Sequence, residues 1–186
     1  MSRRIIGVVV SAAALLAAFG CGSGASDSSV RSGTDGAGAR VNVADGAVDA
    51  AGLRTVAYLG VEFQVPGDWP VHDLDGEPTT CVRFDVHAVY LGQPSADMQC
   101  PAGLVGRAEA VLVQPLAAAA PNTGASSGEV STESVNDLTA EVVSGADVTS
   151  QLDARFASAG VAATITYQDS DATARQILSS FRSAAQ

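Results

Sequence analysis

The chain has 186 residues, with twenty acidic residues, ten arginines and no lysine, and its formal net charge at pH 7 is −10. A surface this acidic repels phosphate groups and anionic lipid headgroups, so the charge balance argues against nucleic acid as a partner. Apolar residues make up 47% of the chain, but many are alanines, so the core must depend on a limited set of larger side chains.

Residues 1–20 are predicted to be a signal peptide. Arg3 and Arg4 precede an apolar run over residues 5–19, and Gly20 follows. The run is shorter than the roughly 20 apolar residues that cross a bilayer as a helix. A basic start, a short apolar middle and small residues at the end are typical of an export signal, so this segment is excluded from the fold.

The sequence Ala18-Phe19-Gly20-Cys21 resembles the lipobox of bacterial lipoproteins, in which the cysteine becomes the acylated first residue of the mature chain. This resemblance implies that palmitate and other acyl chains on Cys21 anchor the protein to the extracytoplasmic face of the cell membrane. Lipidation would also leave an even pair of thiols, Cys81 and Cys100, which we expect to form a disulfide outside the cell. The alternative is ordinary secretory cleavage, because residues 18–20 also follow the small-x-small rule, and a secreted protein with a free Cys21 would result.

Residues 21–53 consist mainly of Gly, Ser, Ala and Asp and show no hydrophobic periodicity. They are predicted to be a disordered tether, because they offer too little apolar surface to offset the entropy lost on ordering. As a flexible coil, the tether has an end-to-end distance on the order of 30 Å. Residues 54–186 are then predicted to form a single α+β domain.

The first half of this domain has the pattern of short strands separated by turns. Alternating apolar residues predict strands at 55–59 and 61–65. Pro66-Gly67 fits the central pair of a type II turn. A further extended segment begins at Trp69. Residues 81–84 and 87–91 are expected to form two short strands or one bent strand. Another strand is expected over 107–115, after a loop over 92–106.

The second half begins with a predicted flexible loop at about 117–134, followed by a strand at 138–142. Residues 151–157 suit a strand or a short helix, and we favour a strand that pairs with 161–167. A helix is expected over 171–184, capped by Asp169 or Ser170. Together these elements predict an antiparallel β-sheet meander of about six or seven strands, covered by a C-terminal helix and closed by one disulfide.

Five residues near the predicted strands are candidates for a binding site: Trp69, His72, Arg83, Asp85 and His87. Arg83 and Asp85 are spaced as an ion pair on one strand face, and Trp69 suits either a stacking platform or a core anchor. If the two histidines and the nearby carboxylates converged, they could form an acid/base or metal site. Neither later cysteine lies in a C-x-x-C motif and the histidine spacing matches no zinc signature, so no metal or cofactor is predicted.

Several segments of the domain resemble an uncharacterised module of exported actinobacterial proteins, which in some relatives stands ahead of a glycoside-hydrolase-like domain. They are VEFQVPGDW (61–69), CVRFDVHAVYLG (81–92), Cys100-Pro101, VGRAEAVLV (105–113) and ATITY (163–167). The resemblance implies an accessory role in the envelope and transfers no catalytic residue.

Two hypotheses follow. The first is a non-catalytic module on the outer face of the membrane that binds an envelope component or a partner protein. The second is a small hydrolase or metal-dependent enzyme that uses His72 and His87 with nearby carboxylates. Convergence of the two imidazoles in one cleft would favour the enzyme, and placement on opposite faces would favour the binding module.

Overall fold

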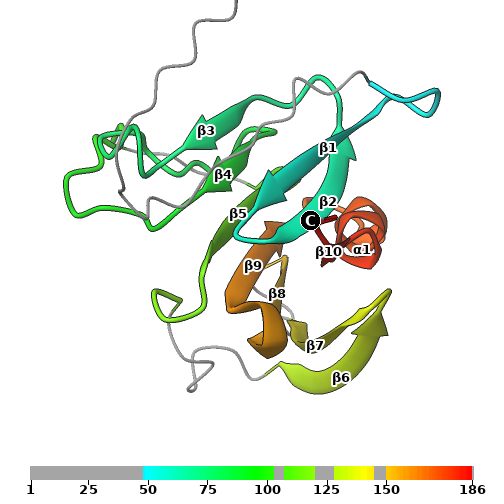
Figure 1. Cartoon of the computed structure of the whole chain (residues 1–186). Coiled ribbons are helices and arrows are strands. Elements are labelled where there is room, and N and C mark those ends of the chain that lie inside the picture. Colours follow the sequence, from blue (N-terminus) through cyan, green and yellow to red (C-terminus); the bar gives the residue numbers. More distant parts are fainter. Residues whose placement is uncertain (1–47, 103–106, 120–127, 145–149, 186) are drawn as a thin grey trace, which may run out of the picture. The chain divides into compact units, whose positions relative to one another are not determined.

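The computed structural model describes residues 48–102, 107–119, 128–144 and 150–185, which contain two β-sheets and one α-helix (Figure 1). All of these residues belong to one unit of the chain, 37–186. The strands are β1 (Leu53–Tyr58), β2 (Val61–Pro66), β3 (Val71–Asp73), β4 (Val89–Leu91), β5 (Ala110–Pro115), β6 (Glu129–Val135), β7 (Leu138–Ser144), β8 (Gln151–Phe156), β9 (Val161–Thr166) and β10 (Arg182–Ser183), and the helix is α1 (Ala172–Ser179). The predicted α+β class is therefore confirmed.

The sheet topology differs from a simple antiparallel meander. Seven strands form one sheet in the order β3-β4-β5-β9-β8-β7-β6, and three form a second sheet in the order β1-β2-β10. Within the larger sheet β3, β4 and β5 run parallel to one another, while the other neighbours are antiparallel. Parallel neighbours need long connections, and the segments that link these three strands carry Cys81 and Cys100.

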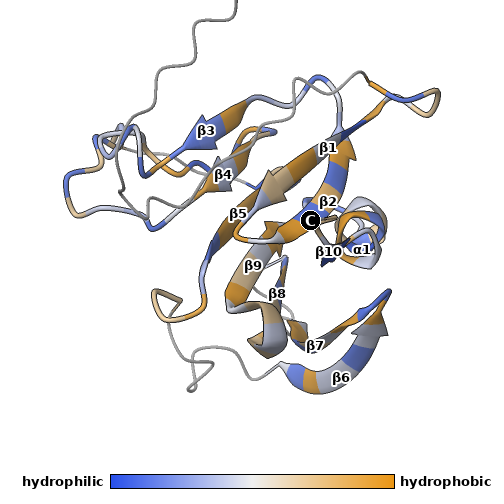
Figure 2. Ribbon diagram, viewed as in Figure 1, coloured by the Kyte–Doolittle hydropathy of each residue, from blue (hydrophilic) through white to orange (hydrophobic). Residues whose placement is uncertain are grey.

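The main core lies between the inner faces of the two sheets and α1. The alternating sequence of β2 places its apolar side chains in this core. Val61, Phe63 and Val65 are fully buried, while the residues between them are only half-buried. Figure 2 shows the apolar residues of β1, β2, β5 and β9 along these strands. At the centre, the ring of Phe181 stacks between Phe63 and Phe156, with ring centroids 4.6 and 4.9 Å apart. Phe181 thus joins the small sheet to the large one.

The C-terminal helix is shorter than predicted. It ends at Ser179 rather than near 184, and Arg182–Ser183 continue as β10 beside β2. The carbonyl of Ser179, the last helical residue, and the carbonyl of Phe181 beyond it both accept hydrogen bonds from the Asn136 side chain of the β6–β7 turn. The predicted side-chain caps are also wrong in detail, because Asp171 is the N-cap residue and makes no cap hydrogen bond, while Ser170 Oγ accepts a bond of 3.3 Å from the Ala172 N–H.

Three other local predictions are wrong. The expected loop at 117–134 contains strand β6, although residues 120–127 of it lie outside the described residues. Residues 81–84 form no strand. The turn after β2 is closed by a bond from the Trp69 N–H to the Pro66 carbonyl, so Gly67 and Asp68 are its central pair and no type II turn centred on Pro66-Gly67 forms.

The predicted hairpin in the second half is confirmed. Strands β8 and β9 pair in antiparallel register around a short 3₁₀ turn, Ala157–Ala159, which ends at Gly160 with φ of +68°. The signal peptide, Cys21 and most of the tether lie outside the described residues. Within the described part of the chain, no helix is long and apolar enough to cross a bilayer.

Candidate functional site

Trp69 and His87 lie together at one end of the main core. The indole is 6% exposed and belongs to the core cluster, as expected for an anchor. The His87 ring stacks on it with centroids 5.4 Å apart, and 57% of the His87 side chain is exposed. The imidazole Nδ1 lies 3.1 Å from the carbonyl oxygen of Glu109 and 3.5 Å from its carboxylate. One edge of the core is therefore closed by a solvent-facing imidazole.

His72 lies in a different environment. Its ring stacks on Tyr90 with centroids 5.1 Å apart, and His72 and Tyr90 are register partners on β3 and β4. Tyr90 belongs to a second, smaller apolar cluster with Leu74, Ala88 and Leu112. This cluster contacts partly buried side chains of the segment that follows Cys81, and burial raises the pKa of the Tyr90 phenol.

The two histidines therefore do not share a site. Along β4, Val89 and Leu91 belong to the main core, whereas Tyr90 belongs to the second cluster, so the two clusters lie on opposite faces of the strand. His87 stacks on a member of the first cluster and His72 on a member of the second. The acid/base site that would use both imidazoles lacks the convergence that it requires.

Arg83 and Asp85 form the predicted ion pair. The guanidinium Nη2 lies 2.8 Å from Asp85 Oδ2, and Nε donates a second bond of 3.1 Å to Oδ1. The hydrogen bond from Arg83 holds the pKa of the Asp85 carboxyl below its ordinary value. The pair lies in the bent segment between β3 and β4, beside the second cluster. Because of this ion pair, the charge of Arg83 is already neutralised by a carboxylate.

The predicted disulfide is present. Cys81 and Cys100 are joined with their Cα atoms 5.0 Å apart. The bond links the β3–β4 connection to the β4–β5 connection. Residues Val82, Phe84 and Val86, which follow Cys81, pack against the second cluster, so the disulfide holds the cover of this face in place.

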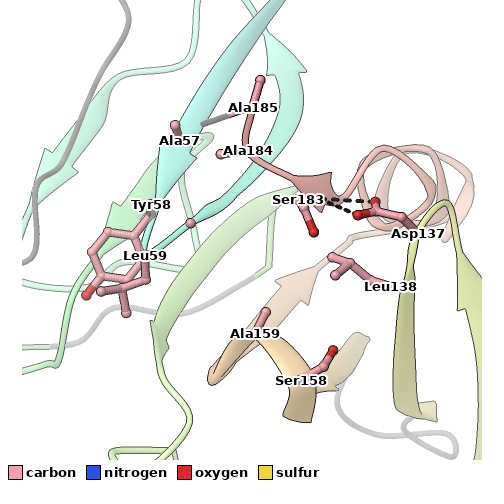
Figure 3. Close-up of a pocket in the computed structure, with 11 residues that line it drawn as sticks. Ala57, Tyr58, Leu59, Asp137, Leu138, Ser158, Ala159, Ser183, Ala184 and Ala185 are labelled. Carbon is pink, nitrogen blue, oxygen red and sulfur yellow. Dashed lines mark hydrogen bonds between the residues drawn. The ribbon is translucent and has the colours of Figure 1, made fainter.

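A pocket of about 640 Å³ lies at the far end of β1 from Trp69 (Figure 3). It is formed where the β1–β2 turn, the β6–β7 turn, the 3₁₀ turn and the chain after α1 meet. Its lining is Ala57, Tyr58, Leu59, Gly60, Asp137, Leu138, Ser158, Ala159, Ser183, Ala184 and Ala185. A pocket of this volume can enclose a small ligand, and the hydroxyls and backbone groups at its wall can orient one.

Asp137 is the charged side chain in this lining. Its carboxylate accepts the Ser183 N–H at 3.1 and 3.4 Å, as Figure 3 shows. Hydrogen bonding to Ser183 lowers the pKa of Asp137, so the carboxylate is ionised at neutral pH. The pocket therefore combines one fixed negative charge with methyl groups and two serine hydroxyls.

Leu59 at the pocket wall has an unusual backbone conformation. It forms the two-residue turn between β1 and β2 with Gly60, and their φ angles are +48° and +81°. Both residues of such a turn need positive φ, and the first of them is usually Asn or Gly. The Leu59 side chain packs against the main core, which compensates for the backbone cost. Strain held at a pocket wall is a common mark of a functional surface.

None of these pocket residues was predicted from the sequence. Asn136-Asp137 before the alternating segment 138–142 was the available signal, because a polar pair of this kind favours a turn. The meeting of two hairpin tips with the chain after α1 depends on tertiary packing, which no local pattern encodes. No protein-family model, curated protein or solved structure was found that matches this chain.

Proposed function

We propose that this chain is a lipid-anchored, non-catalytic binding module on the extracytoplasmic face of the cell membrane. The disulfide between Cys81 and Cys100 supports an oxidising location. It leaves Cys21 as the remaining thiol, available for acylation after removal of the signal peptide. The resemblance to exported actinobacterial modules favours the same location.

The binding role rests on one observation, the 640 Å³ pocket where two hairpin tips meet the chain after α1. Its volume falls in the range of small-ligand sites. Its wall offers the Asp137 carboxylate, the hydroxyls of Ser158 and Ser183, and the apolar surface of Leu59 and Leu138. These groups suit the reversible binding of a small ligand from the envelope.

The chemistry of the wall indicates the ligand class. A negative charge favours an ammonium group, and the serine hydroxyls suit a ligand that carries hydroxyls of its own. We therefore propose an amino-bearing, hydroxyl-rich ligand such as an amino sugar unit. The net charge of −10 adds long-range attraction for a cation.

The anchor is tested by metabolic labelling with an alkyne-bearing palmitate in a bacterial host that acylates lipoproteins. The intact chain is expected to be labelled and to fractionate with membranes. Cys21→Ala should lose both the label and the membrane association. Equal labelling of the two proteins would contradict the anchor.

The pocket is tested by titrating the chain with glucosamine and, as a neutral control, with glucose, while the amide resonances of Gly60 and Ser183 are followed. Glucosamine is expected to shift these resonances saturably, and the titration should give a lower dissociation constant for glucosamine than for glucose. Asp137→Asn should remove the preference for glucosamine, whereas Asp171→Asn at the N-cap of α1 should retain it. Absence of saturable shifts with both sugars, or a preference unaffected by Asp137→Asn, would overturn the proposed ligand class.

A further inference from the structure

Arg54 is a cation on the inner face of β1. Its register partner on β2 is Val65, which is fully buried, and it shares its strand face with Val56 and Tyr58. A charged residue at such a position normally has a partner of opposite charge, because an unpaired charge loses solvation when it is partly buried.

No carboxylate lies within 4.0 Å of Arg54 among the described residues. Its Nη2 donates to the carbonyl oxygen of Trp69, while Nε is buried and makes no hydrogen bond. By contrast, Arg83, Arg175 and Arg182 each have a carboxylate oxygen within 2.8 Å. Acidic side chains outnumber arginines two to one in this chain, yet none of the described ones pairs with Arg54, whose Nε is buried.

Arg54 is half-buried, so part of its side chain reaches solvent. Trp69, whose carbonyl accepts the bond from Arg54, also carries the exposed His87 ring on its indole face. The guanidinium has five N–H donors, and among the described residues its one hydrogen-bond acceptor is the Trp69 carbonyl. One end of the core thus presents a guanidinium that has no carboxylate partner among the described residues. It is bonded to the backbone of Trp69, whose indole stacks with the exposed imidazole of His87.

We propose that Arg54 binds an oxyanion, a carboxylate or phosphate group of a ligand, next to Trp69, whose backbone carbonyl already accepts a bond from the guanidinium. A guanidinium forms strong charge-assisted hydrogen bonds with both groups. An anion here would supply the negative charge that the described residues do not provide. This inference goes beyond the proposed function, since the site lies at the opposite end of β1 from the pocket next to Tyr58 and Leu59.

Trp69 is the single tryptophan of the chain, so its fluorescence reports on this site directly. The exported chain carrying Cys21→Ser is titrated with sodium acetate and, separately, with sodium phosphate. Sodium chloride at matched ionic strength is the control, because screening alone also changes with added salt. We expect a saturable change with acetate, with phosphate, or with both, and a linear, small change with chloride.

Arg54→Gln is expected to weaken this binding about tenfold to a hundredfold, the loss that corresponds to one charge-assisted hydrogen bond. Arg107→Gln is the matched control, because Arg107 lies over the Phe84 ring, 5.6 Å from its centroid, and should leave binding unchanged. If Arg54→Gln does not fold, the ¹⁵N resonance of the Arg54 Nε in the otherwise unchanged chain gives the same answer, because it should shift saturably.

Saturation by acetate alone assigns a carboxylate ligand, and saturation by phosphate alone assigns a phosphate. Binding by neither anion, or equal binding by the Arg54→Gln protein, overturns the inference. These outcomes leave the lipid label on Cys21 and the sugar titration of the pocket unaffected, so failure here is distinct from failure of the proposed function.

Discussion

Asn136 Nδ2 donates a hydrogen bond of 2.7 Å to the carbonyl oxygen of Phe181, 45 residues later in the chain. The same amide group donates to the Ser179 carbonyl at 2.9 Å. The carbonyl of the last helical residue and a carbonyl two residues further on are thereby satisfied by a side chain from the β6–β7 turn rather than by a continued helix. The relationship explains both where the helix ends and how the chain reaches β10.

We expect Asn136→Gly to destabilise the protein by about 1–3 kcal/mol through the loss of these two bonds. Glycine is the appropriate variant because Asn136 has φ of +52°, which glycine adopts without strain. The free energy of unfolding from urea denaturation is the measurement. Gln176→Ala, an exposed site on α1, serves as the control and should change stability by less than about 0.5 kcal/mol.

Phe181 should be among the most sensitive positions in the core. Its ring is fully buried and stacks on both Phe63 and Phe156, with interplanar angles of 5° and 13°. Phe181→Ala is expected to cost about 3–5 kcal/mol, because it leaves a cavity between the two sheets. Phe181→Leu retains most of the volume and should cost clearly less. Equal losses for the two variants would contradict a packing role for the ring.

The disulfide should stabilise one face of the large sheet more than the other. Removing it with Cys81→Ala and Cys100→Ala together is expected to cost about 3 kcal/mol by the chain-entropy relation, given the sequence separation of 19. Hydrogen exchange should accelerate most in 82–88, whose apolar residues cover or belong to the second cluster. Unchanged protection there, with a general loss elsewhere, would show that the bond does not act on this face.

Much of the fold could be predicted because its signals are local. The alternation of Val61, Phe63 and Val65 placed β2, and the cysteine count placed the disulfide. The end of α1 could not be predicted, because the apolar spacing of Ile177, Leu178 and Phe181 suits a longer helix. The competing force is tertiary, since Phe181 leaves the helix to enter the stack with Phe63 and Phe156.

Among the candidate sites too, features that depend on neighbouring residues could be predicted, and features that depend on tertiary packing could not. The Arg83–Asp85 ion pair depends on two residues close in sequence and is present as predicted, although its segment is bent and forms no strand. Whether His72 and His87 converge depends on which face of β4 each occupies, and the structure places them with different clusters. Strand β6 was missed because its inward and outward residues are both mostly polar, so it lacks the apolar alternation of a half-buried strand.

Tyr58 gives a pH-dependent prediction. The residue is 1% exposed and its hydroxyl oxygen is buried without a hydrogen bond of good geometry. Burial, followed by the nearby charge of Asp75, raises the pKa of Tyr58 from 10.0 to about 12. Above pH 10 the unfolded chain loses the phenolic proton while the folded protein keeps it, so the unfolded state binds fewer protons and stability falls as pH rises towards 12.

We expect Tyr58→Phe to reduce the fall of the free energy of unfolding with rising pH. At pH 7 it should raise this free energy by about 1 kcal/mol, because it removes a buried hydroxyl that lacks a partner. Urea denaturation at a series of pH values between 7 and 11.5 measures both effects. Some alkaline dependence should remain from Tyr90, whose pKa is also raised by burial, and Tyr58→Phe combined with Tyr90→Phe should reduce it further. A Tyr58→Phe protein with the same alkaline slope as the unchanged chain would show that the Tyr58 phenol ionises equally in the folded and unfolded states.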